Sequence, residues 1–238
     1  QAQYGRRLGT TAEYVALDSS RAAKLPDNIS FEVGACLGIP VMTAHRCVFA
    51  DGDVSGQKIL ITGGAGRVGY YAIQWAASAG AFVVATASND IDRKLCLELG
   101  ASAVVNHRED NWGEQVVAAI GGQKVDRVVD VEFGSSLPEV LKCINVGGTI
   151  ATYSSTVVPQ PILPFKEMMF MDLTIRMVIV YAMPEKAKQA AIADIYNLLA
   201  SDQLQHRVAH VVPLNDLAHS HELIEDGGLG GCVVVSID

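Results

Sequence analysis

The hydrophobic residues between positions 58 and 153 gather in short runs that alternate with segments of helical spacing. Short apolar runs rich in Val, Ile and Ala are typical of strands buried on both faces of a sheet. The predicted strands span residues 58–62, 81–87, 103–105, 125–131 and 149–153, and the predicted helices span 70–79, 90–99, 111–120 and 138–144. This alternation predicts an α/β fold of the Rossmann type, a doubly wound parallel sheet with helices on both faces.

The flanking segments carry further elements. Helices are predicted at residues 31–37, 41–49, 184–199 and 215–225, and strands at 11–17, 208–212 and 232–235. Asp90 is expected to cap one inner helix, and Asn111 with Glu114 to form a capping box for the next. The apolar run 173–181 has little charge and predicts an edge strand. Because an exposed flat edge invites pairing, we expect a homodimer through this strand.

A cluster of glycines directly follows the first inner strand. Gly64, Gly66 and Gly69 satisfy the pattern G-x-G-x-x-G. In a dinucleotide site the first glycine permits a tight turn, the second lets a pyrophosphate approach the backbone, and the third lets the helix pack closely on the sheet. The helix N-terminus also offers free N–H groups to phosphates. The order of strand, glycines and helix favours dinucleotide binding over a turn that serves packing alone.

The end of the second inner strand indicates which dinucleotide is preferred. Sites for NAD usually place Asp or Glu about 20 residues past the glycines, where it binds the ribose 2′-OH. This chain has Ser88 there, and Arg93 and His107 are cations that would suit the 2′-phosphate of NADP. Asp90 and Asp92 argue against that phosphate. On balance the sequence favours NADP(H).

Composition excludes several other classes. A hydrophobic share of 50% with 18% charged residues is typical of a globular protein. The net charge of −8 argues against a nucleic-acid partner. No apolar run approaches the ~18 residues that a membrane span needs. The five cysteines are widely spaced and form no C-x-x-C, which indicates a reducing compartment such as the cytoplasm.

Evidence for metal or acid–base chemistry in the sequence is weak. His219 and His221 lie two positions apart on a predicted helix. Such residues point about 200° apart, so the two imidazoles cannot share one ion unless the helix breaks. We therefore predict no metal site, and we name no residue as a catalytic acid or base.

Several segments together resemble the medium-chain dehydrogenase/reductase superfamily. They are residues 38–44, the glycine turn 63–69, and 99–101 with 105–109. Within the superfamily the chain is similar to the zeta-crystallin-like NADPH:quinone oxidoreductases, which also match the closing segment 217–225 and the Val-rich strand after it. The residues that this resemblance assigns to the cofactor groove are Thr43 near the nicotinamide, Ala65, Gly66, Arg67 and Val68 at the pyrophosphate, Ser88 and His107 near the adenosine ribose and its phosphate, and Tyr153, Ser154 and Ser155 along the groove.

The chain departs from this family in three respects. The relatives are longer, and the N-terminal part of their GroES-like β-barrel domain has no counterpart here. The lysine that many of them use for the 2′-phosphate aligns with Asp92, which leaves Arg93 as its stand-in. Zinc alcohol dehydrogenases carry a ligand cysteine where this chain has Ile39, so the resemblance implies a zinc-independent enzyme.

The resemblance implies hydride transfer from NADPH to a quinone or a similar activated acceptor. An enoyl or alkenal double-bond reductase on the same scaffold is one alternative, and a non-catalytic, crystallin-like nucleotide-binding protein is another. The implied domains are residues 1–37 as the C-terminal part of the GroES-like domain, 38–181 as the Rossmann domain, and 182–238 as a segment returning to the catalytic domain.

Overall fold

The computed structural model describes residues 9–237, so residues 1–8 and 238 of the predicted terminal segments lie outside the described residues. The chain divides into two compact units. Residues 43–179 form one of them, and the segments before residue 43 and from residue 180 onward form the other. Helix α2 (Ile39–Phe49) contains the boundary.

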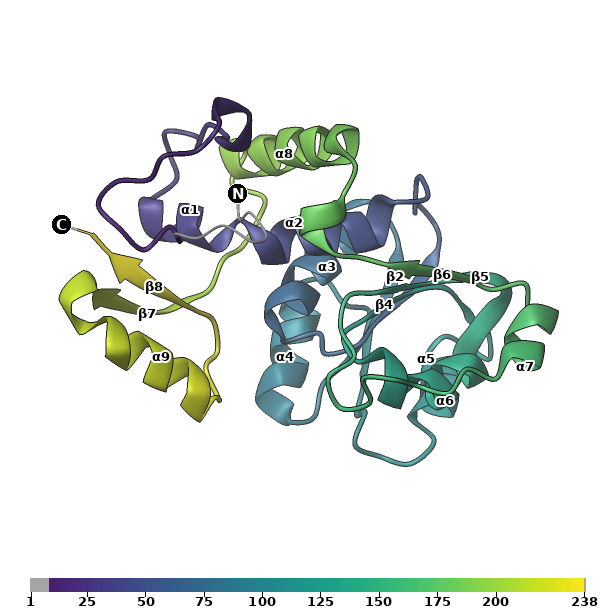
Figure 1. Cartoon of the computed structure of the whole chain (residues 1–238). Helices are drawn as coiled ribbons and strands as arrows, with labels where there is room; N and C mark the ends of the chain where they lie inside the picture. The colour runs from purple at the N-terminus through teal and green to yellow at the C-terminus, as the bar shows by residue number, and fades with distance from the viewer. Residues whose placement is uncertain (1–8, 238) are drawn as a thin grey trace. The chain divides into compact units, whose positions relative to one another are not determined.

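The unit of residues 43–179 is built on a six-stranded parallel sheet (Figure 1). Its strands are β1 (Lys58–Ile61), β2 (Phe82–Thr86), β3 (Ala103–Val105), β4 (Val125–Asp130), β5 (Ile144–Thr152) and β6 (Thr174–Met177). Their order across the sheet is β3-β2-β1-β4-β5-β6. The chain therefore winds outward from β1 in one direction and then restarts on the other side, which confirms the predicted Rossmann-type fold.

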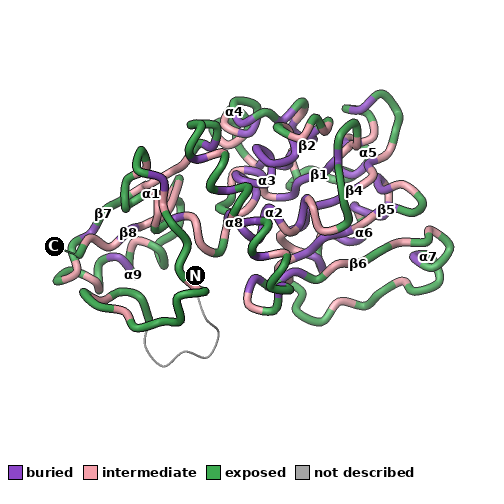
Figure 2. The backbone as a smooth tube through the Cα atoms, turned by 90° about the horizontal axis from the view of Figure 1, so that it is seen from above, coloured by how far each residue is buried: buried purple, intermediate pink, exposed green. Residues whose placement is uncertain are grey.

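Helices cover both faces of this sheet. They are α3 (Arg67–Ser78), α4 (Asp90–Glu98), α5 (Trp112–Ala119), α6 (Phe133–Cys143) and α7 (Phe165–Phe170). Helices α5 and α6 bury Trp112, Val116 and Leu137 in one core with Leu60 and Val128 of the strands. Because strand side chains alternate between faces, the residues flanking Leu60 point to the opposite face, against which α3 packs. Figure 2 shows β1 and β4 buried, whereas the segment leading to α7 is exposed.

A partly buried ion network links the edge strand to the end of α2. Arg127 on β4 is only 4% exposed and donates from Nη1 to the carbonyl of Cys47 at 2.9 Å. Its Nη2 lies 2.7 Å from the carboxylate of Asp51, which also pairs with Arg176 on β6. The Arg176 guanidinium, and after it that of Arg127, holds the pKa of Asp51 below its ordinary value despite the opposing effect of burial. One carboxylate thus pairs with two cations.

The second unit contains a small β-α-β arrangement. Strands β7 (Val208–Pro213) and β8 (Cys232–Ser236) pair in parallel and are joined by α9 (Leu217–Asp226). The remaining elements are α1 (Phe31–Cys36), α8 (Glu185–Ala200) and the short 3-10 helices η1 (Ser19–Arg21), η2 (Val180–Ala182) and η3 (Leu214–Asp216). Ser30 caps α1 by accepting a hydrogen bond from Val33 N.

Several predicted boundaries are wrong. Asn89, not Asp90, caps α4, because its carboxamide oxygen accepts from Asp92 N at 2.9 Å. The capping box at Asn111 does not form, because Asn111 has a left-handed backbone (φ 57°) and its side chain accepts from Lys142 instead. Helix α6 begins before Pro138 and contains it.

Two strand predictions are also wrong. Residues 11–17 form no strand, and Tyr14 is 91% exposed, since the described residues supply no neighbouring strand for this segment. The edge strand β6 is shorter than the predicted 173–181, because the chain turns into η2 at Val180. Helix α7 was not predicted, since its short sequence lies in a proline-rich connection.

Candidate functional site

The carboxyl ends of the parallel strands bring most of the predicted site residues to one edge of the sheet. Strand β1 lies between β2 and β4, with Ile61 aligned with both Ala85 and Val129. The reversal of winding falls between β1 and β4, and in doubly wound sheets ligands bind outside the carboxyl ends at this position. The glycine turn follows β1 directly.

The glycine turn is held by hydrogen bonds from both sides. Gly63 has a left-handed backbone (φ 62°) and donates to Thr86 Oγ1 at 3.0 Å, while Gly66 N donates to the carbonyl of Gly63. The tight turn therefore depends on Gly63, not on Gly64 as the motif predicts. A Cβ on Gly64 would lie 2.8 Å from the Cys96 sulfur, so this glycine permits close packing on α4.

Of the other two glycines of the motif, Gly69 is buried and packs against the turn, whereas Gly66 is exposed. A Cβ on Gly69 would clash with the carbonyl oxygen of Gly63 and lie 2.9 Å from the Cα of Gly64, so Gly69 brings α3 against the turn. Gly66 is exposed, and a Cβ there would meet the Gly63 oxygen at 3.1 Å. Gly66 is also the N-cap of α3, and the first N–H groups of this helix, on Arg67 and Val68, have no partner within it. Gly66 and Arg67 are exposed, and Ala65 and Val68 are half-buried, so the backbone of this segment could bind an anionic group.

Ser88 and His107 follow β2 and β3, and Arg93 lies on α4, which connects these strands. Ser88 is half-buried, whereas Arg93 and His107 are exposed. The Arg93 guanidinium donates to the carbonyl of Val104 at 2.7 Å, which anchors it across β3. Partial burial, and after it the charge of Arg108, lowers the pKa of His107, so His107 favours its neutral form near pH 7.

A buried polar cluster lies at the ends of β1, β4 and β5. Thr62 Oγ1 donates to Asp130 at 2.7 Å and accepts from Val131 N at 2.9 Å. Asp130 is fully buried, and its Oδ2 has no hydrogen-bond partner among the described residues. Burial raises the pKa of Asp130, although the Thr62 hydroxyl opposes this effect. Sequence reasoning did not single out Asp130; a carboxylate that ends an apolar strand was the available signal.

Tyr153 belongs to this cluster, and Thr43 lies on a helix that approaches it. Burial, and after it Cys47 and Asp130, raises the pKa of the Tyr153 phenol. Cys47 lies one turn after Thr43 on α2, so both residues occupy the same helix face. Thr43 itself is buried, at 4% exposure. Ser154 and Ser155 follow on the chain and bind the first residues of α6 through Phe133 N and Gly134 N.

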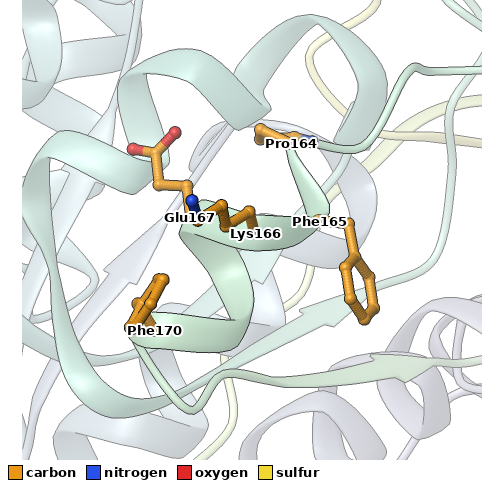
Figure 3. Close-up of a pocket in the computed structure, with 5 residues that line it drawn as sticks. All are labelled: Pro164, Phe165, Lys166, Glu167 and Phe170. Atoms are coloured by element: carbon orange, nitrogen blue, oxygen red, sulfur yellow. The ribbon is translucent and has the colours of Figure 1, made fainter.

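Two pockets are lined by other residues. One is lined by Pro164, Phe165, Lys166, Glu167 and Phe170 of α7 and the residue before it (Figure 3). The other, of about 410 Å³, lies within the second unit between α1 and α8. Within residues 9–237 no group of three His, Cys, Asp or Glu side chains could hold a metal ion. Nor is any helix of that part of the chain long and apolar enough to cross a membrane.

Comparisons with known proteins agree with this geometry. The family model described as zinc-binding dehydrogenase matches residues 68–196, which is more than half of the chain. A quinone oxidoreductase from Pongo abelii is 28% identical over 231 residues, covering 95% of this chain and 69% of that protein. The crystal structure of an NAD-dependent alcohol dehydrogenase superposes with a TM-score of 0.88 at 30% identity, covering 100% of this chain and 68% of that one.

A further solved structure carries a ligand. A mycobacterial protein in complex with NADPH gives a TM-score of 0.82 at 25% identity, covering 92% of this chain and 69% of its own. These likenesses extend over the glycine turn, the parallel sheet and both flanking segments. The chain belongs to the zinc-binding dehydrogenase family and is a quinone-oxidoreductase-like member of the medium-chain dehydrogenase/reductase superfamily.

Proposed function

We propose that the chain binds a nicotinamide dinucleotide at the glycine turn, with NADPH preferred to NADH. The observation that carries the proposal is the exposed Gly66 at the N-terminus of α3, which no side chain of the described residues caps and which lies where the winding of the sheet reverses. Backbone N–H groups at this position bind a pyrophosphate without a side chain. We assign the pyrophosphate to residues 65–68 and the adenosine ribose to Ser88.

The proposed reaction is hydride transfer to a quinone or a similar activated acceptor, as the names of the quinone oxidoreductase relatives suggest. The bound cofactor would supply the hydride from C4 of its nicotinamide. The protein would orient the cofactor along Tyr153, Ser154 and Ser155, with Thr43 toward the nicotinamide, and exclude water. The described side chains do not fit a zinc ion, and we assign no step to one.

We retain the flanking segments 1–37 and 182–238 as parts of a GroES-like catalytic domain. A cytoplasmic location is supported by the five cysteines, none of which forms a disulfide.

The preference for NADPH is tested by paired titrations of NADPH and NADH, followed by cofactor fluorescence. We expect the chain to bind NADPH more tightly, because the cationic Arg93 side chain is anchored to Val104 of β3, the strand that pairs with β2. The variant Arg93→Ala should weaken NADPH by about tenfold and NADH little, as expected for one lost charge-assisted contact. Equal losses for both would remove Arg93 from the 2′-phosphate site. Absence of binding by the unaltered chain would contradict the proposed function.

We also propose that two copies of the chain pair through β6. This strand is the outermost of the sheet, and Met177 and Ile179 beside it are 76% and 54% exposed. Helix α7 adds Phe165 and Phe170, which project from it in Figure 3 and are 73% and 71% exposed. An apolar edge of this kind is usually covered by another subunit.

Sedimentation equilibrium tests the pairing. We expect a dimer for the unaltered chain and a shift toward monomer for Met177→Lys, since the lysine would place a charge in the interface. Ile91→Lys is the matched control, because Ile91 is 81% exposed on α4, on the far side of the strand order. A monomeric unaltered chain, or equal effects of both lysines, would contradict the proposal.

A further inference from the structure

Residues 154–158, which follow β5, are held against the start of α6 by several hydrogen bonds. Glu132, the residue that precedes α6, directs its carboxylate at residues 156–158. Its Oε2 accepts from the N–H and the hydroxyl of Thr156 at 2.8 and 2.9 Å. Its Oε1 accepts from the N–H groups of Val157 and Val158 at 3.1 and 3.3 Å. One side chain therefore satisfies three successive backbone donors, 24 to 26 residues away in sequence.

The reciprocal bonds run from α6 back to the same segment. Phe133 N donates to the carbonyl of Ser154 at 3.0 Å, and Gly134 N donates to Ser155 Oγ at 2.9 Å. The Ser155 hydroxyl then donates to the carbonyl of Val158 at 2.6 Å. A Cβ on Gly134 would lie 2.6 Å from the Val158 Cβ, so the two segments meet too closely for any larger residue.

These bonds occupy the first N–H groups of α6. The first donors of a helix are free to bind a ligand, but here the segment 154–158 occupies those of Phe133 and Gly134. Partial burial acts to raise the pKa of Glu132, yet the backbone donors of residues 156–158 and the Thr156 hydroxyl together lower it. Glu132 is therefore charged near pH 7, and it accepts all four bonds as a carboxylate.

We propose that Glu132 is a positioning residue of the cofactor groove, which fixes the segment 154–158 at the carboxyl edge of the sheet. This inference rests on the proposed function, because Ser154 and Ser155 belong to the assigned groove. Without the carboxylate, three backbone donors lose the acceptor that holds them against α6, and because residues 156–158 are exposed, water can replace it in many arrangements of the segment. Binding a cofactor would then require ordering the segment again, which weakens affinity.

The test uses Glu132→Gln and, as a matched control, Glu139→Gln. A glutamine keeps one acceptor oxygen and replaces the other with a donor, so it can satisfy only one pair of the four donors. Glu139 lies on the same helix and likewise accepts a backbone bond, from Gly113 N at 2.9 Å, but it faces α5. Amide hydrogen exchange and NADPH titration are measured for both variants and for the unaltered chain.

We expect Glu132→Gln to weaken NADPH by at least about tenfold, as for a lost charge-assisted network, and to accelerate exchange at residues 156–158. Glu139→Gln should leave both unchanged. If amide exchange in Glu132→Gln becomes faster while NADPH affinity is unchanged, the positioning role is overturned. If exchange is unchanged, Glu132 does not hold residues 154–158 in place. If the unaltered chain bound neither NADPH nor NADH, the proposed function would fail and the role of Glu132 with it. If the unaltered chain binds NADPH and Glu132→Gln binds it equally tightly, this inference alone is overturned.

Discussion

Asp51→Ala is expected to lower the free energy of unfolding of the unit of residues 43–179 by about 2–3 kcal/mol, because the buried guanidinium of Arg127 loses its charged hydrogen-bond partner. The variant leaves the guanidinium of Arg127, whose side chain is 5% exposed, without its anion. It also removes the partner of Arg176 on the edge strand. Denaturant titration followed by far-ultraviolet circular dichroism measures the loss.

Lys94→Ala is the control for this experiment. Lys94 pairs with Glu98 at 3.8 Å, but their side chains are 80% and 58% exposed, so the loss should be within about 0.5 kcal/mol. Equal losses for the two variants would contradict the role given to Asp51.

The contribution of Asp51 to the free energy of unfolding depends on pH. Since the folded-state pKa of Asp51 lies below the unfolded value of about 3.9, its contribution is complete above that pH and is lost as pH falls through the folded-state pKa. We therefore expect the difference between the unaltered chain and Asp51→Asn to shrink in acid.

Gly66→Val is expected to weaken nicotinamide nucleotide binding by at least about a hundredfold, since a branched side chain would occupy the place of the pyrophosphate. The fold should survive. Gly66 has an extended backbone (φ −69°, ψ 166°) that any residue adopts, and its Cβ would approach only the Gly63 oxygen, at 3.1 Å. Fluorescence titration and thermal unfolding are measured on the same preparation.

Two other glycine variants serve as controls for Gly66→Val. Gly38→Ala should change neither affinity nor stability, because nothing lies within 4 Å of the added Cβ. Gly69→Ala should destabilise the unit, because its Cβ would clash with the turn itself. Unchanged affinity in a folded Gly66→Val variant would remove the pyrophosphate from this turn.

Hydrophobic periodicity was sufficient to predict the sheet. Runs such as residues 59–61 and 82–85 are apolar at successive positions, as expected of strands that helices cover on both faces. Local capping was less predictable. The side chain of Asn111 binds Lys142, which lies 31 residues further along the chain, and such a partner overrides the local pattern with Glu114.

The candidate site was predicted only where it depends on local sequence. The glycine turn is visible because its strand, glycines and helix are contiguous, although the left-handed position proved to be Gly63. Asp130 and Glu132 were not assigned roles, because their partners lie on other strands. Thr62 is 68 residues from Asp130, and Thr156 is 24 residues from Glu132. Single-sequence patterns carry no information about such pairs.

The bridge between Asp51 and Arg176 has a kinetic consequence. The two residues are 125 positions apart, and β6 joins the sheet only through β5 at its margin. Closing so long a loop carries a large entropic cost, so this contact is expected to form after the transition state for folding. Interactions absent from that state slow unfolding without changing the rate of folding. Asp51 would then act chiefly by prolonging the lifetime of the folded sheet.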